Sequence, residues 1–200
     1  MKRLSVLLSV AIFSAAAIFA SAGSDESRVL PIGSKLDGFS MPDPSGTEHA
    51  YKDVKGENGT LIIFLSAQCP VVKMYNERIN EAADIYKKKG INVVGIYSNH
   101  TESLEWVTSH SAENYGFTVL IDKNNVFADK LGASFTPEVF YFNSSDVLDY
   151  HGAIDNDRYA RNISRQYLQT ALEEKLAGKA ISVQDTKAFG CSIKRVQDKQ

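Results

Sequence analysis

The chain has 200 residues, with 22 Lys and Arg against 24 Asp and Glu and a formal net charge of −2. This balance gives no electrostatic reason to expect nucleic acid or an anionic membrane as a partner. A hydrophobic content of 44% is that of a globular chain rather than a disordered one. Two cysteines are too few for a disulfide scaffold, and the four scattered histidines lack metal-ligand spacing. We therefore expect neither a metal nor an organic cofactor.

The N-terminus has the three parts of a secretory signal peptide. Two basic residues precede an apolar run over residues 4–20, and a small-x-small pattern, Ala-Ser-Ala, follows at residues 20–22. We predict a signal peptide over residues 1–22 and an exported protein, periplasmic or secreted. An uncleaved membrane anchor is the alternative, because the run is nearly long enough to cross a bilayer. No other long apolar stretch occurs, so we expect no membrane association after cleavage.

The rest of the chain is long enough for one domain with a core. We assign residues 23–180 to this domain and residues 181–200 to a C-terminal tail that carries Cys191. Residues 23–60 are rich in Gly and Pro and predict short edge strands and loops. Helices and strands then alternate, in this order: strand 61–65, helix 70–89, strand 91–97, helix 101–110, strand 117–121, helix 126–131, a hairpin of strands 138–142 and 147–150, and helix 159–177.

Hydrophobic patterning supports these elements. The run LIIFL at residues 61–65 is continuously apolar, as in a strand buried on both faces. Helix 70–89 has apolar residues at helical spacing and ends at Gly90, a suitable C-cap. Alternating helices and buried strands that close with a hairpin predict an α/β fold, with a mixed central sheet and helices on both faces.

Cys69 lies where the first buried strand leads into its helix, with Pro70 at the first helical position. Free backbone N–H groups and the helix dipole favour an anion at a helix start, so a thiol there is predisposed to ionise. The thiolate is the nucleophile that attacks a disulfide or a peroxide. The alternative is a buried cysteine packed as a small hydrophobe.

Motifs along the chain resemble the redoxin branch of the thioredoxin superfamily, of the alkyl hydroperoxide reductase/thiol-specific antioxidant (AhpC/TSA) type. The resemblance covers residues 30–195 and points to a bacterial exported subgroup with a Gly-Cys-Ser-Ile-Lys tail. It rests on IGSKLDGF at 32–39, FLSAQCP at 64–70, CPVVKMYNERI at 69–79, Thr136-Pro137 and TKAFGCSIK at 186–194. It implies a thioredoxin-like fold. It also implies that Pro137 is a cis-proline and that its loop, with Thr136, lies against the reactive cysteine and can pair with an extended thiol substrate.

The chain also departs from the patterns of related enzymes. Thioredoxin-type oxidoreductases carry Cys-x-x-Cys preceded by Trp, whereas this chain has Val72 at the fourth position and Gln68 before the cysteine. Peroxiredoxins place Pro seven residues and Thr or Ser three residues before the reactive cysteine. Ser66 matches the hydroxyl, but Ile62 stands at the proline position, and the peroxide-polarising arginine has no clear counterpart.

Cys191 is the candidate partner of Cys69. A thiolate oxidised to sulfenic acid condenses readily with a second thiol, which makes Cys191 a candidate resolving cysteine. The alternative is a permanent Cys69–Cys191 disulfide that attaches the tail to the domain. The other polar cluster, residues 151–158, is interpreted as a polar loop.

The leading hypothesis is an exported thiol-dependent oxidoreductase that performs thiol-disulfide exchange or slow peroxide reduction. Its site would comprise Cys69, Cys191, Ser66, Thr136 and Pro137, and its partners would be protein or small-molecule thiols and disulfides, and peroxides. The second hypothesis is a noncatalytic thioredoxin-fold binding module with a structural disulfide. Copper handling in the manner of the Sco proteins needs two neighbouring cysteines and a histidine. Val72 stands where the second cysteine of a Cys-x-x-Cys motif would be, which argues against copper handling.

Overall fold

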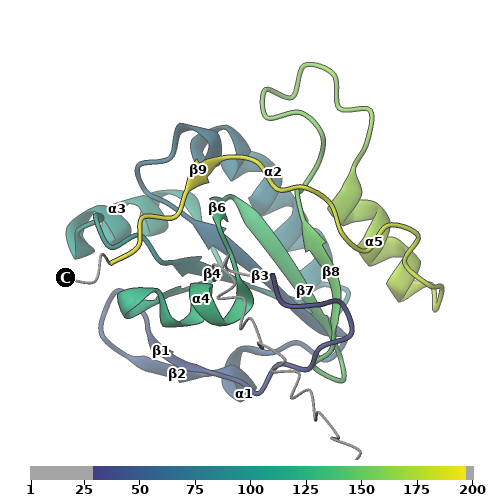
Figure 1. Ribbon diagram of the computed structural model, residues 1–200, viewed down its shortest axis with the longest axis horizontal. Coiled ribbons are helices and arrows are strands. Elements are labelled where there is room, and N and C mark those ends of the chain that lie inside the picture. The colour runs from purple at the N-terminus through teal and green to yellow at the C-terminus, as the bar shows by residue number, and fades with distance from the viewer. Residues whose placement is uncertain (1–28, 197–200) are drawn as a thin grey trace, which may run out of the picture.

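A computed structural model describes residues 29–196 of the chain and shows a central sheet of five strands in the order β5-β4-β3-β7-β8 (Figure 1). The strands are β3 (Gly59–Leu65), β4 (Ile91–Tyr97), β5 (Thr118–Ile121), β7 (Glu138–Asn143) and β8 (Leu148–Gly152). β3, β4 and β5 are parallel, whereas β7 runs antiparallel to both β3 and β8. The predicted mixed sheet is therefore confirmed.

The remaining elements lie around this sheet. They are β1 (Ser40–Pro42), β2 (Glu48–Ala50), α1 (Tyr51–Val54), α2 (Pro70–Lys87), α3 (Leu104–Asn114), the 3₁₀ turn η1 (Lys123–Asn125), α4 (Val126–Leu131), β6 (Phe135–Thr136), α5 (Tyr167–Leu176) and β9 (Cys191–Ser192). Of these, β1–β2 and β6–β9 form two separate two-stranded sheets. The predicted signal peptide, residues 1–22, lies outside the described residues. Within the described part of the chain, no helix combines the length and apolar character needed to cross a bilayer.

The central strand β3 separates two hydrophobic cores. All seven of its residues are buried, and successive side chains point to opposite faces of the sheet. Leu61, Ile63 and Leu65 pack with α2 and α5, whereas Ile62 and Phe64 pack with α1 and α4. Helices on both faces thus bury the strand that leads to the cysteine, as the apolar run predicts.

Two helices begin later than the sequence indicates. α3 starts at Leu104 rather than Thr101, because the hydroxyl of Ser103 accepts the Trp106 N–H at 3.2 Å and caps the helix. α5 starts at Tyr167 rather than Tyr159. The preceding loop is stabilised by the Asp157 carboxylate, which accepts the backbone N–H groups of residues 159, 161 and 162 at 2.7–2.9 Å and so competes with helix formation.

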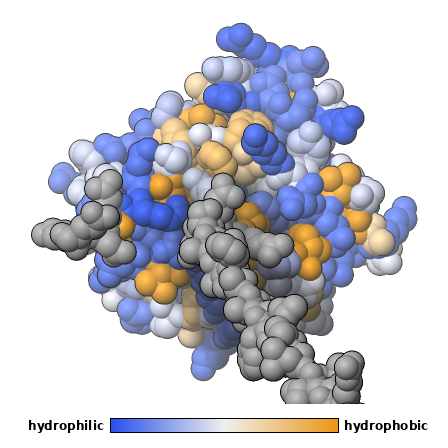
Figure 2. All heavy atoms as spheres, viewed as in Figure 1, coloured by the Kyte–Doolittle hydropathy of each residue, from blue (hydrophilic) through white to orange (hydrophobic). Residues whose placement is uncertain are grey.

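The C-terminal tail lies across the molecule rather than extending away from it. From the end of α5 it passes β8 and α2 and reaches α3, and β9 within it lies beside β6 (Figure 1). β9 pairs antiparallel with β6, with Thr136 opposite Cys191 and Phe135 opposite Ser192. In Figure 2, apolar residues gather where the tail crosses, between hydrophilic regions on either side. The tail is thus part of the folded domain.

Candidate active site around Cys69

Cys69 lies at the junction of β3 and α2 and is 1% exposed. It is the N-cap residue of α2, with Pro70 at the start of the helix. Its backbone N–H donates to the hydroxyl of Ser66 at 3.1 Å. The buried strand and the helix start at Pro70 therefore determine the position of the sulfur, and Ser66 closes the turn between them.

Thr136 and Pro137 lie directly against this cysteine. The peptide bond between them is cis, as the resemblance implies. The thiol of Cys69 donates to the carbonyl oxygen of Thr136, with a distance of 3.2 Å from Sγ to the oxygen. Sγ accepts no N–H of the first turn of α2, so its hydrogen-bond partner is this carbonyl rather than the helix start.

Cys191 lies next to Cys69 because β9 pairs with β6. Both cysteines are free thiols. Burial, followed by the hydrogen bond and the charge of Cys69, raises the pKa of Cys191 to about 11, although the Val71 N–H and the charge of Lys194 act in the opposite direction. Cys191 therefore carries its proton at neutral pH. The structure thus brings together all five predicted site residues, two of them from segments more than 100 positions apart.

Glu102 is a site residue that the sequence analysis missed. One of its carboxylate oxygens accepts three hydrogen bonds: from the Ser66 hydroxyl at 2.5 Å, the Gln68 N–H at 3.0 Å and the Asn99 amide at 3.2 Å. The carboxylate therefore holds the turn that precedes Cys69. Nothing in the local sequence marks this residue, because it precedes the cap of α3 in an irregular loop.

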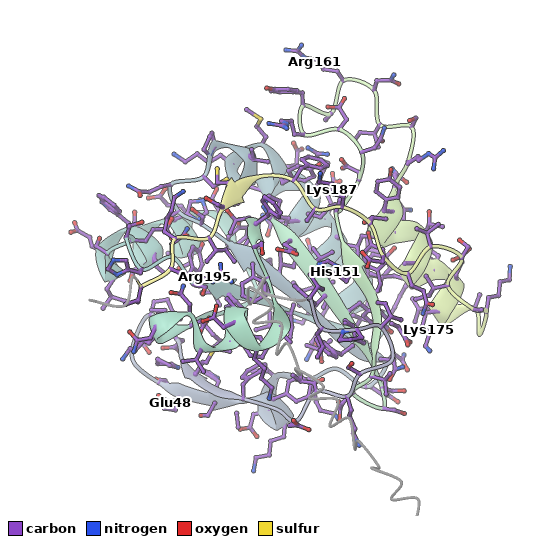
Figure 3. All side chains as sticks on the ribbon, viewed as in Figure 1. Glu48, His151, Arg161, Lys175, Lys187 and Arg195 are labelled. Carbon is purple, nitrogen blue, oxygen red and sulfur yellow. The ribbon has the colours of Figure 1, made fainter. Side chains whose placement is uncertain are left out.

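A buried contact between a histidine and a carboxylate lies next to Pro137. His151 is on β8, inside the molecule (Figure 3), and its Nε2 lies 2.7 Å from a Glu138 carboxylate oxygen. The other Glu138 oxygen accepts the N–H groups of Ser134 and Phe135 at 2.6 and 2.8 Å. The prediction of a polar loop at residue 151 is therefore wrong. His151 lies on β8 and contacts Glu138, which orders the segment leading into β6.

A hollow of about 700 Å³ opens between α2 and α3 beside the turn that precedes Cys69. Its lining includes Ala67 and Gln68 from that turn, and side chains of both charges and several amides from the helices: Lys73, Asn76, Trp106, Ser109, His110, Glu113 and Asn114. No described group of three or more His, Cys, Asp and Glu residues could hold a metal ion.

Several solved structures are similar to this chain. A crystal structure of a hypothetical protein from Sinorhizobium meliloti is 28% identical, covers 86% of this chain and 98% of that one, and superposes with a TM-score of 0.78. The peroxidoxin BcpB of Mycobacterium tuberculosis is 14% identical, with 73% and 94% covered and a TM-score of 0.56. A putative thiol:disulfide interchange protein DsbE from Chlorobium tepidum is 17% identical, with 76% and 99% covered and a TM-score of 0.57.

At these low identities, the last two likenesses establish the fold and confirm that it is thioredoxin-like. Among curated proteins, none matches the sequence significantly. The model of the AhpC/TSA family matches residues 32–156, which is more than half of the chain and includes Cys69, Thr136 and Pro137. On this evidence, the chain belongs to the AhpC/TSA family.

Proposed function

We propose that this protein is an exported thiol oxidoreductase in which Cys69 is the nucleophile and Cys191 the resolving thiol. The observation that carries the proposal is the shared contact of both cysteines with one residue. Thr136 accepts the Cys69 thiol through its carbonyl oxygen and lies opposite Cys191 in the β6–β9 pair. A disulfide requires the two Cα atoms to lie within about 7 Å of each other, and the contact of both cysteines with Thr136 supports such a pairing.

The chemistry proceeds in two steps. In the first, the Cys69 thiolate attacks a disulfide, forming a mixed disulfide and releasing one thiolate, or attacks a peroxide, forming a sulfenic acid and releasing an alcohol or water. In the second, the Cys191 thiolate attacks the oxidised sulfur of Cys69. The protein disulfide forms, and the second thiol, or water from the sulfenic acid, leaves. An external dithiol reduces the protein disulfide and restores both thiols.

The raised pKa of Cys191 suits its proposed role as the resolving thiol. Two of the three causes that raise its pKa, the hydrogen bond and the charge of Cys69, depend on the reduced Cys69 sulfur. Oxidation of the Cys69 sulfur removes both of these contributions, so the pKa of Cys191 falls when a thiolate is needed to resolve the intermediate. Until then, Cys191 stays protonated and Cys69 is the thiol that reacts first.

The competing function is a binding module in which the two cysteines form only a structural disulfide.

The DsbE-like and peroxidoxin neighbours share the fold, and a secreted disulfide oxidoreductase of Mycobacterium tuberculosis, 16% identical with a TM-score of 0.52, shares it as well. The secretory pattern at residues 1–22 and these neighbours support export of the present chain.

Paired variants separate the two functions. Cys191→Ser treated with one equivalent of hydrogen peroxide or of glutathione disulfide should accumulate a sulfenic acid, trapped by dimedone, or a mixed disulfide, both at Cys69 and both detectable by intact mass. Cys69→Ser should give neither product at Cys191. A structural disulfide predicts the opposite pattern: equal loss of stability in both variants and no reaction of either remaining thiol.

A further inference from the structure

The backbone edge nearest to the reactive sulfur is β6, because the carbonyl oxygen of Thr136 contacts Cys69 Sγ. Exposed strand edges bind extended polypeptides through main-chain hydrogen bonds. A polypeptide that presents a cysteine to Cys69 in extended form would therefore run along β6. That edge is already occupied by β9 of the same chain, with Cys191 opposite Thr136.

The segment that occupies this edge fits closely. Gly190 has no room for a side chain, because a Cβ there would lie 2.0 Å from the Thr136 carbonyl oxygen. Ala188 and Ile193, on either side of the cysteine, are buried to 3% and 5% exposure. The Ile193 N–H also donates to the Ser134 carbonyl at 2.9 Å, next to β6. The tail thus covers the edge through backbone pairing and apolar contact together.

Polar contacts hold the tail on both sides of β9. Before the strand, the Thr186 hydroxyl lies 2.8 Å from the Tyr150 hydroxyl and accepts the Ala153 N–H at 2.9 Å. After it, the Lys194 N–H donates to the Asn99 side chain at 2.7 Å. Arg195 lies beside α4 (Figure 3), and its Nε–H donates to the Asp129 carboxylate at 2.7 Å. A polypeptide substrate would have to break these contacts before it could pair with β6.

The hollow between α2 and α3 remains open to small molecules, since no tail residue lines it. Its lining includes a cation, Lys73, an anion, Glu113, and the half-exposed ring of Trp106. It adjoins Cys69 through Ala67 and Gln68 of the turn that precedes the cysteine. A polar ligand with groups of both charges fits such a lining.

We propose that the substrate of Cys69 is a low-molecular-weight disulfide that carries both carboxylate and ammonium groups, and that β9 excludes extended polypeptides from the site. This inference rests on the proposed redox function. The disulfide RSSR is reduced to two RSH: Cys69 takes one half as a mixed disulfide and releases the other as a thiolate. Cys191 then releases the second half and forms the Cys69–Cys191 bond.

The test compares two full-domain proteins that each keep Cys69 as their single thiol. One is Cys191→Ser, with the tail in place, and the other ends at Gln184 and lacks the tail. Mixed-disulfide formation at Cys69 is followed by intact mass with three probes: glutathione disulfide, the uncharged bis(2-hydroxyethyl) disulfide, and a disulfide-linked dimer of an extended ten-residue peptide. We expect Cys191→Ser to react with glutathione disulfide at least about tenfold faster than with the peptide dimer. Loss of the tail should raise the ratio of the peptide rate to the glutathione rate by about tenfold or more.

A second variant keeps the proposal testable if the shortened protein fails to fold. Gly190→Val in the Cys191→Ser background keeps the full chain but places a side chain against Thr136, so it should raise the same ratio. Gly116→Val is the matched control, because nothing lies within 4 Å of a Cβ at that position. Lys73→Gln and Glu113→Gln should slow the reaction with glutathione disulfide and leave that with bis(2-hydroxyethyl) disulfide unchanged.

Three results would contradict the proposal. Equal rates of Cys191→Ser with the peptide dimer and with glutathione disulfide would show that β9 excludes nothing. An unchanged ratio in folded Gly190→Val or in the folded tail-less protein would show the same. Equal effects of the Lys73 and Glu113 variants on both small disulfides would remove the charge recognition. Failure of Cys69 to react with both small disulfides and with hydrogen peroxide would instead overturn the proposed redox function, and is therefore distinguishable.

Discussion

The hydroxyl of Ser66 donates to the carboxylate of Glu102 across 2.5 Å, joining the turn before Cys69 to the loop before α3. Without this carboxylate, the Ser66 hydroxyl and the Gln68 N–H have no acceptor in the structure. We expect Glu102→Ala to lower the free energy of unfolding by about 1–3 kcal/mol, the cost of leaving the buried Ser66 hydroxyl unpaired. Urea unfolding at pH 7 measures this change in the free energy of unfolding.

Two comparisons separate this role from a general effect of removing charge. Glu102→Gln keeps an oxygen acceptor and should cost less than the alanine variant. Glu57→Ala removes an exposed carboxylate away from the site and should stay within about 0.5 kcal/mol of the unmodified protein. If the three variants unfold alike, Glu102 does not hold the turn.

Cys191 should react with alkylating agents in a strongly pH-dependent way. Its pKa of about 11 means that the thiolate fraction rises about tenfold for each pH unit between about 7 and 10. Cys69→Ala removes the hydrogen bond and charge that raise this pKa, so the profile should shift to lower pH. Peptide mapping after timed exposure to iodoacetamide measures both profiles. Superimposable profiles would show that the two sulfurs do not interact.

His110 should make stability depend on pH near neutrality. Burial lowers its pKa from 6.5, and Lys73 acts in the same direction, whereas the charges of Glu102 and Glu113 raise it. The unfolded chain therefore binds a proton before the folded one, and the stabilisation present above pH 6.5 is lost as the pH falls below that value. Between the two pKa values the loss is at most about 1.4 kcal/mol per pH unit.

The His110→Gln variant isolates this contribution. A glutamine can keep a hydrogen bond with the Tyr97 hydroxyl, which lies 2.7 Å from Nδ1 in the structure, but does not titrate. The unmodified protein should lose more stability than the variant between about pH 7.5 and 5.5 in urea unfolding. Parallel losses would assign the pH dependence to other groups.

Asp155 holds the loop before α5 through a buried ion pair. It accepts the Tyr75 hydroxyl at 2.7 Å and also pairs with Arg78. Asp155→Ala leaves the guanidinium and the hydroxyl without this partner, so we expect a loss of about 3–5 kcal/mol. The double variant Asp155→Leu with Arg78→Met removes both charges and should lose less. A double variant as unstable as Asp155→Ala would show that packing, rather than the unpaired charge, accounts for the loss.

The sequence by itself determined the elements whose signals are local. The apolar run at residues 61–65, the Cys-Pro start of α2 and the Asn-Ser-Ser-Asp turn at 143–146 are each readable because periodicity and turn chemistry act within a few residues. Their alternation sufficed for the mixed sheet with helices on both faces. The motifs around residues 69, 136 and 191 likewise suggested the candidate site residues.

Only the tertiary structure decided which of these segments meet. The pairing of Cys191 with Thr136 joins a tail without periodicity to a two-residue strand, and no local pattern predicts such a contact. Glu102 and the Glu138–His151 pair became visible in the same way, because a carboxylate's partners depend on where distant loops lie. The late start of α5 has the same cause. The Asp157 carboxylate accepts the backbone N–H groups of residues 161 and 162, which the apolar pattern of the sequence assigns to a helix. Local physics thus specified the elements, and long-range hydrogen bonds and burial specified the site.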